Sequence, residues 1–260
     1  SFLGILRNLQ CLFQIPREMG PPALAVGPTG QHAKDTLVAA AGLADPAIVD
    51  AMVADGPRAI ARLIDLGARF DRDDFGQLAL SREGAHSRSR VVRAGGDAAG
   101  AEIVRALSAA VMEARAIDLR TESFLEDLLL EEGRVVGLTA TSASGDVLVH
   151  GARAVVLATG GIGRLFPETT NPREATGDGL AAAARAGARL ADLEFIQFHP
   201  TALDVARDPM PLITEALRGA GALLVDARGR SLCIEGWERA ELAPRDIVAR
   251  SMVLEVLEGR

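Results

Sequence analysis

The spacing of apolar residues divides the chain into helical and extended stretches. Between residues 31 and 66, apolar positions recur every three or four residues, which predicts helices. Asp45 followed by Pro46 marks one helix start, and Pro57 marks the start of a second helix that ends at Gly67. Further helices are predicted over residues 100–114, 180–186 and 244–257.

The period changes to two after residue 123. Three short strands joined by hairpin turns are expected at Phe124–Leu130, Val135–Thr141 and Val147–His150. Arg153–Ala158 then forms a continuous apolar run, which is typical of a strand covered on both faces. Residues 70–84 are predicted to form a polar loop. The mixture predicts an α/β fold with an inserted β-meander, a class that does not by itself name a function.

Composition excludes several classes of function. The 260 residues carry 28 basic and 35 acidic side chains, a net charge of −7, and only 3% of them are aromatic. Nucleic-acid binders need a basic field and stacking rings, so none is expected here. Two cysteines are too few for a disulfide framework or a zinc site, and no apolar run reaches the ~20 residues of a membrane span. We expect a cytoplasmic protein without a metal site.

Two glycine-containing stretches suit a phosphate-bearing cofactor. Gly160 and Gly161 follow the Arg153–Ala158 run, and Asp178 stands between glycines at a predicted helix start. Glycine lets a backbone approach a bulky ligand, and a helix start offers free N–H groups. A tight turn and an ordinary N-cap are the simpler alternatives. The usual G-x-G-x-x-G signature of dinucleotide binding is absent from the chain.

Other polar residues interrupt apolar surroundings. The charges of residues 81–87 suit either a solvated loop or a polar pocket wall that recognises a zwitterionic or anionic ligand. For His199 a satisfied core position is the simpler alternative. The simpler alternative for Thr214 is a helix cap near Glu215, and for Arg245 it is a charge pair on the surface of a proline-started helix. Each of these residues alone is weak evidence for a functional site. Their order and spacing along the chain make the evidence stronger.

Taken in order, four segments carry a resemblance to a known family. They cover residues 169–179, 194–201, 214–219 and 242–246. The chain resembles the flavoprotein family of succinate dehydrogenase, fumarate reductase and L-aspartate oxidase, from about Gly27 to Arg260. The resemblance implies an α/β fold, namely an incomplete FAD-binding domain of the fumarate reductase type with the start of an α+β capping domain. Residues 1–26 are unassigned, 27–191 are expected in the FAD-binding domain, and 192–260 in the capping domain.

The stretch from Arg82 to Ser87 looks like the aspartate oxidase version of the family pattern. In that version a glutamate, here Glu83, faces the α-ammonium group of the substrate. A second anion beside a plain dicarboxylate would repel it, whereas an ammonium group needs a counter-charge. Ala85 stands where a second glycine is usual, a departure that leaves the charges untouched.

The resemblance also implies roles for the later motifs. His199 and Thr214 would donate hydrogen bonds to one substrate carboxylate. Glu215 would lie on the same side of the substrate pocket and take part in its proton network. Arg245 would be the acid/base residue. The pKa of arginine exceeds 12, but its planar donor fork suits a dianionic substrate.

FAD is the cofactor that the family implies. Asp178 resembles a flavin-contacting aspartate, and Gly160 and Gly161 would let the chain pass the cofactor. Phe124 and Leu125 align with backbone contacts to its adenosine part. The family begins with a G-x-G-x-x-G strand and continues beyond the equivalent of Arg260, so we expect this chain to cover the middle of such an enzyme.

The implied activity is oxidation of L-aspartate to iminoaspartate, with oxygen or fumarate as electron acceptor. The product would supply quinolinate synthase, the expected partner, in NAD biosynthesis. Two alternatives stay open. One is a fumarate reductase or succinate dehydrogenase flavoprotein, although His32 lacks the context of a covalent flavin attachment. The other is an inactive fragment.

Overall fold

The computed structural model describes residues 29–83, 85–96, 98–213, 215–219, 221–232, 234 and 240–258. These residues fall into two compact units. The sheet unit contains residues 103–196 and 206–210, and the helical unit contains residues 29–102, 197–205 and 211–258. The predicted division at residue 192 into cofactor and capping domains stays a prediction.

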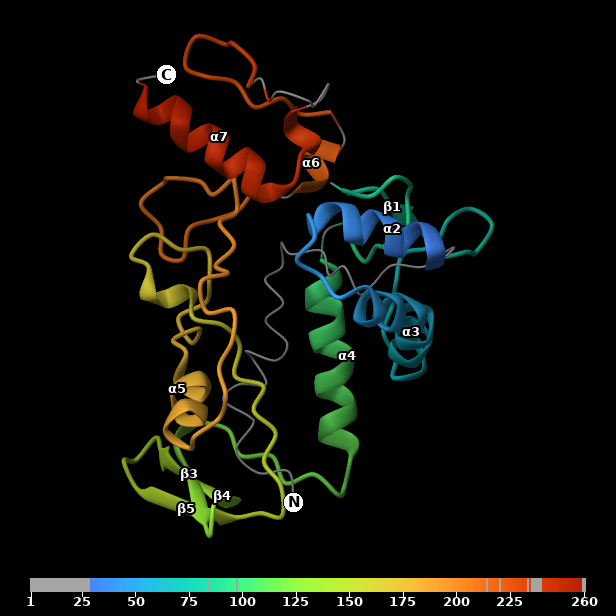
Figure 1. The fold of residues 1–260 in the computed structure, drawn as a ribbon. Coiled ribbons are helices and arrows are strands. Elements are labelled where there is room, and N and C mark those ends of the chain that lie inside the picture. The colour runs from blue at the N-terminus through green and yellow to red at the C-terminus, as the bar shows by residue number, and fades with distance from the viewer. Residues whose placement is uncertain are drawn as a thin grey trace. The chain divides into compact units, whose positions relative to one another are not determined.

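The sheet unit is built on the expected β-meander (Figure 1). Its strands are β3 (Ser123–Glu131), β4 (Arg134–Ser142) and β5 (Val147–Gly151), antiparallel in the order β3-β4-β5. Leu125, Leu138 and Ala140 form its buried core. The predicted strands and turns are confirmed, because alternating apolar positions give the sheet one packed face.

Helix α5 (Asp178–Arg185) packs beside this sheet (Figure 1). Its Ala182 is fully buried in the sheet core. Arg185 Nε donates to Asp127 Oδ1 on β3 at 2.7 Å. The chain leaves the helix through Gly187, whose φ of 83° suits a glycine after a helix end. Most of helix α4 (Ala99–Glu113) also belongs to this unit, and a short 3₁₀ turn, η2, spans Gly163–Leu165.

The predicted buried strand at Arg153–Ala158 is wrong. The segment forms no strand, and Val156 is 55% exposed. Only alternate residues, Val155 and Leu157, pack against the sheet core. A strand needs a hydrogen-bonded neighbour, and none of the described strands lies beside this segment.

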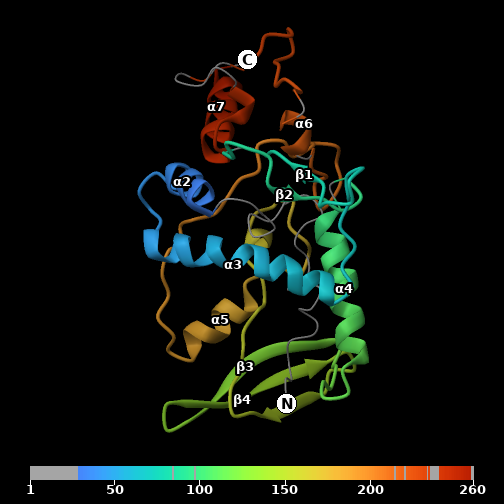
Figure 2. The same cartoon turned by 90° about the vertical axis from the view of Figure 1, so that its right-hand side faces the viewer.

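The helical unit opens with α2 (Thr29–Ala39) and α3 (Pro46–Asp65), which pack together. Asp45 caps α3 by accepting the Ala47 N–H at 2.8 Å. The prediction of a separate helix beginning at Pro57 is wrong, because α3 runs through this proline as one helix (Figure 2). Apolar positions before and after the proline share one buried face, which offsets the missing N–H donor; they are Val49, Val53 and Ile60.

The rest of the helical unit carries short elements. Strands β1 (Leu80–Ser81) and β2 (Val91–Val92) pair antiparallel, so the expected polar loop ends in a strand. Three further elements are α6 (Glu215–Gly219), η3 (Ala240–Leu242) and α7 (Arg245–Leu257). Helix α7 starts after Pro244 as predicted. No helix in the described part of the chain is both long and apolar enough to cross a membrane.

Candidate active site

The first residues of α6 and α7 form a buried ion pair within the helical unit. Arg245 Nε donates to Oε2 of Glu215 at 2.6 Å, and Arg245 Nη2 lies 2.5 Å from the same oxygen. Arg245 Nη1 donates to the Gln197 side-chain oxygen at 3.0 Å. The side chains of Arg245 and Glu215 are only 16% and 10% exposed. These contacts fix the plane of the guanidinium, the donor fork suited to a carboxylate.

Arg218 is a second buried guanidinium beside Glu215. Its Nη2 lies 3.6 Å from Glu215 Oε2, and its Nη1 donates to the Glu241 backbone oxygen at 2.9 Å. Arg218 lies one helical turn after Glu215, so the i, i+3 spacing places both on one face of α6. Glu215 is therefore a carboxylate shared by two arginines.

His199 has one satisfied nitrogen and one unsatisfied nitrogen. Its Nδ1 lies 3.2 Å from the Thr201 backbone nitrogen, which donates to it. Because Nδ1 accepts a hydrogen bond, the neutral ring carries its proton on Nε2. Within the described residues Nε2 is buried without a hydrogen-bond partner. The ring thus presents one N–H donor that has no acceptor in the described part of the chain.

Burial and nearby arginines keep this ring neutral. Desolvation, reinforced by Arg245 and Arg218, lowers the pKa of His199 to about 4, although Glu215 acts in the opposite direction. A neutral imidazole with a free Nε2–H can donate to a carboxylate but cannot supply a full positive charge. This arrangement differs from the satisfied core histidine that was the simpler alternative.

Glu83 faces the same charged group from the β1–β2 side of the unit. It lines a cavity of about 430 Å³ with Glu215 and Arg245. Burial and the neighbouring Glu215 charge raise the pKa of the Glu83 carboxyl, while Arg245 acts against them. A cationic group entering the cavity would relieve this repulsion between carboxylates.

The structure thus brings together most of the predicted substrate residues. Glu83, Glu215 and Arg245 line one cavity, and His199 lies within electrostatic range of the last two. Thr214 lies outside the described residues. Sequence reasoning assigned no role to Gln197 or Arg218, although both stand in the motifs that carried the resemblance.

The predicted cofactor residues lie in the sheet unit, where two glycine stretches meet. A Cβ on Gly179 would stand 2.0 Å from Thr159 Oγ1, so only glycine lets α5 start this close to the Thr159–Gly161 segment. Gly160 has a φ of 75°, in the region that favours glycine. A Cβ at Gly161 would meet nothing within 4 Å. The backbone therefore leaves open space beside a helix start, which fits a bulky phosphate-bearing group.

Three other predicted cofactor residues also lie in the sheet unit. Asp178 is the first residue of α5, and its carboxylate accepts a hydrogen bond from the Thr176 hydroxyl. Phe124 and Leu125 sit on β3, which has one strand neighbour among the described residues. Every second backbone group of such a strand points away from its neighbour and is available to a ligand.

A family model described as an FAD binding domain matches residues 20–260. The match covers both glycine stretches and all of the charged cavity residues. The chain belongs to this family of FAD-binding domains. FAD, the cofactor expected from the sequence, is therefore confirmed as the cofactor of its family.

More specific relatives are about half identical to this chain over the aligned region. It is 49% identical to an L-aspartate oxidase of Caulobacter vibrioides over 88% of this chain and 45% of the relative. It is 52% identical to an L-aspartate oxidase of Streptomyces coelicolor over 91% of this chain and 42% of that one. The chain therefore spans less than half the length of these curated relatives.

A solved structure supports the predicted fold class. The chain superposes on an E. coli quinol fumarate reductase with a TM-score of 0.82 and 29% identity, covering 91% of this chain and 43% of that chain. The fold is thus the α/β fold of the fumarate reductase flavoproteins, as the sequence predicted.

Proposed function

We propose that the chain forms the central part of an L-aspartate oxidase. This enzyme oxidises L-aspartate to iminoaspartate and passes the electrons to oxygen or fumarate. The identity to relatives of that name supports the proposal. The observation that carries it is the placement of the Glu83 carboxylate in a cavity with Glu215 and Arg245. An acidic group near the Arg245 guanidinium suits a substrate that carries an ammonium group as well as carboxylates.

The substrate carboxylates would meet the donors of the cavity. Arg245 offers the N–H groups that remain after its contacts with Glu215 and Gln197. His199 offers its Nε2–H, which has no acceptor among the described residues. Thr214, by the family resemblance, would add a hydroxyl donor to the same carboxylate as His199. Glu83 would accept hydrogen bonds from the α-ammonium group. Substrate charges of both signs would then be matched at opposite sides of one cavity.

The proton chemistry would belong to Arg245 and Glu215. FAD, when bound, accepts the hydride equivalent that leaves the substrate carbon. The predicted residues for holding it are Asp178, Gly160, Gly161, Phe124 and Leu125. Arg245 would move the proton at its guanidinium nitrogen, and the Glu215 carboxylate at 2.6 Å would exchange that proton with it. Arg218 Nη2, 3.6 Å from the same Glu215 oxygen, would help to hold that carboxylate in place.

A second candidate is a fumarate reductase or succinate dehydrogenase flavoprotein. The fold of the E. coli quinol fumarate reductase favours it. Glu83 argues against it, because a carboxylate there repels a substrate that has only carboxylates. A third hypothesis is that the chain is an inactive fragment. A purified protein without the visible absorbance of a bound flavin would favour it.

The remaining proposals concern the cellular setting. Iminoaspartate is short-lived in water, so an enzyme that consumes it is expected to act nearby, and quinolinate synthase is the proposed consumer. We propose the cytoplasm as the site of this chemistry.

The substrate test uses the purified, FAD-loaded protein under anaerobic conditions. L-Aspartate is expected to bleach the flavin absorbance, and succinate at the same concentration is expected to do so far more slowly. Oxygen should then restore the absorbance and yield peroxide. Rapid bleaching by succinate with none by L-aspartate would overturn the proposal in favour of the second candidate.

A further inference from the structure

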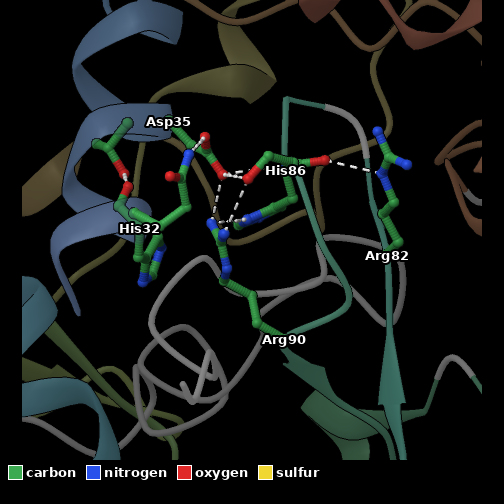
Figure 3. A network of polar contacts seen from close by, with 8 residues as sticks. His32, Asp35, Arg82, His86 and Arg90 are labelled. Carbon is green, nitrogen blue, oxygen red and sulfur yellow. Dashed lines mark hydrogen bonds and ion pairs between the residues drawn. The ribbon is translucent and has the colours of Figure 1, made fainter. Parts of the chain in front are cut away.

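A buried guanidinium lies behind the loop that carries Glu83. Arg90 is 2% exposed and stands just before β2. Its Nη1 donates to Asp35 Oδ2 at 2.7 Å and lies 3.2 Å from His86 Nδ1, and its Nη2 donates to Ser87 Oγ at 3.3 Å (Figure 3). One arginine thus ties helix α2 to two consecutive residues of the loop.

Asp35 on α2 completes the connection. Its Oδ2 accepts the Ser87 backbone N–H at 2.8 Å and the Ser87 hydroxyl at 2.7 Å. Its Oδ1 accepts from Gln31 at 2.9 Å. These hydrogen bonds, despite burial, hold the pKa of the Asp35 carboxyl well below its ordinary value. The charged carboxylate therefore binds both the backbone and the side chain of the loop at one position.

The loop itself links Ser87 to Glu83. The His86 backbone N–H donates to the Glu83 carbonyl at 3.3 Å. Arg82 Nε donates to the His86 carbonyl at 2.9 Å (Figure 3). The flanking strands β1 and β2 share only two residue pairs. So short a pair of strands does not fix the path of the nine residues between them. That path therefore depends on the other contacts of the loop.

We propose that Asp35 and Arg90 are positioning residues that place the Glu83 carboxylate for an ammonium group of the substrate. Asp35 and His86 also line the cavity that contains Glu83. In this proposal neither Asp35 nor Arg90 binds substrate, and both act through Ser87 and the turn at His86. Ser87→Ala leaves both charges in place, so it tests the positioning role apart from a direct effect of the Asp35 charge. The proposal rests on the proposed function, because it assumes that Glu83 receives the ammonium group. It adds that amino-acid selectivity depends on helix α2, which lies outside the motifs that carried the resemblance.

A buried ion pair with a merely structural role makes a different prediction. Its loss would weaken the fold and lower every activity by the same factor. A positioning role instead changes the balance between two substrates, because fumarate has no ammonium group and needs no contact with Glu83. The ratio of L-aspartate oxidation to fumarate reduction therefore distinguishes a positioning role of the Asp35–Arg90 pair from a merely structural one.

The test compares four variants of the FAD-loaded protein: Glu83→Gln, Asp35→Asn, Ser87→Ala and, as a matched control, Ser89→Ala. Ser89 lies exposed in the same loop, and the hydrogen bonds of Asp35 and Arg90 described above go to Ser87 and not to Ser89. KM and kcat are measured for L-aspartate oxidation and for fumarate reduction, and thermal melting is recorded for each variant. Asp35→Asn is expected to raise KM for L-aspartate about tenfold, the loss of about one charged hydrogen bond.

Ser87→Ala is expected to give a smaller rise of the same kind, about threefold, because the backbone hydrogen bond to Asp35 remains. KM for fumarate should stay within about twofold in both variants, and Ser89→Ala should match the unaltered protein in both reactions. If Asp35→Asn does not fold, Ser87→Ala decides the matter, since it removes only one hydroxyl.

Two results would overturn the proposal. One is an equal loss of both activities in the variants that fold, and the other is an unchanged KM for L-aspartate in all of them. Either result together with a selective loss in Glu83→Gln refutes the positioning role and leaves the proposed function intact. Unaltered protein that oxidises no L-aspartate would overturn both.

Discussion

Arg245 Nη2 lies 2.5 Å from Oε2 of Glu215, and each residue is the first of its helix. Residues 30 positions apart in the chain thus form one buried pair, with Gln197 holding the other face of the guanidinium. The pair organises the cavity, because Glu83 and His199 both lie within reach of its charges. Its charge balance is therefore expected to govern both stability and turnover.

Replacing Glu215 by glutamine should destabilise the protein and abolish turnover in both directions. Glutamine keeps the shape but leaves Arg245 and Arg218 without their shared counter-charge. Removing one partner of a buried pair costs about 3–5 kcal/mol. Urea unfolding measures this loss, and Asp246→Asn is the control, because Asp246 pairs with Arg250 in an exposed contact on α7. Equal stability of the two variants would contradict the account.

The pH dependence of L-aspartate oxidation should report Glu83. Its raised pKa means that the carboxyl loses its proton only above the ordinary range of a glutamate. Since the ionised form is needed to receive an ammonium group, kcat/KM for L-aspartate should rise with pH through that raised pKa. The rise should be absent from fumarate reduction. A pH profile of both reactions tests this, and the same acidic limb in both would contradict it.

Acidification should cost stability through His199. Its pKa is about 4 in the folded protein and near 6.5 when unfolded, so the unfolded chain binds the extra proton first. The free energy of unfolding should therefore fall as the pH drops from about 6.5 to about 4. The variant His199→Asn should show a shallower fall over the same window in denaturant titrations. Identical slopes would show that His199 does not contribute.

Adding a methyl group at Gly179 should disturb the predicted cofactor cradle. The new Cβ would overlap the Thr159 side chain, and overpacking of this kind costs about 1–3 kcal/mol. Gly179→Ala should lower both the melting temperature and the amount of FAD that copurifies. Gly151→Ala is the matched control in the same unit, because a Cβ there meets nothing within 4 Å. Full FAD content in Gly179→Ala would contradict the role assigned to this packing.

Local signals predicted much of the fold. Alternating apolar positions located the β-meander, and Asp45-Pro46 located the start of α3. The failures have physical causes. Pro57 looked like a helix start, but packing on both sides of it keeps α3 continuous. The Arg153–Ala158 run looked like a buried strand, but pairing depends on a neighbour that local sequence does not reveal.

The site was predictable as a set of residues but not as a network. Glu83, Glu215 and Arg245 stood out through their motifs, and the structure places them around one cavity. The contacts of Asp35 with Ser87 and Arg90 join positions 52 and 55 residues apart. No periodicity or spacing in the chain signals such a contact, so only coordinates reveal it.

The most direct test of the central claim is the ratio of two activities in Glu83→Gln. Glutamine keeps the size and polarity of the side chain and removes only its charge. The account predicts a loss of L-aspartate oxidation of about a hundredfold, while fumarate reduction stays within about threefold of the unaltered protein. Equal losses in the two reactions, or an unchanged rate with L-aspartate, would contradict the claim that Glu83 is the partner of the substrate ammonium group.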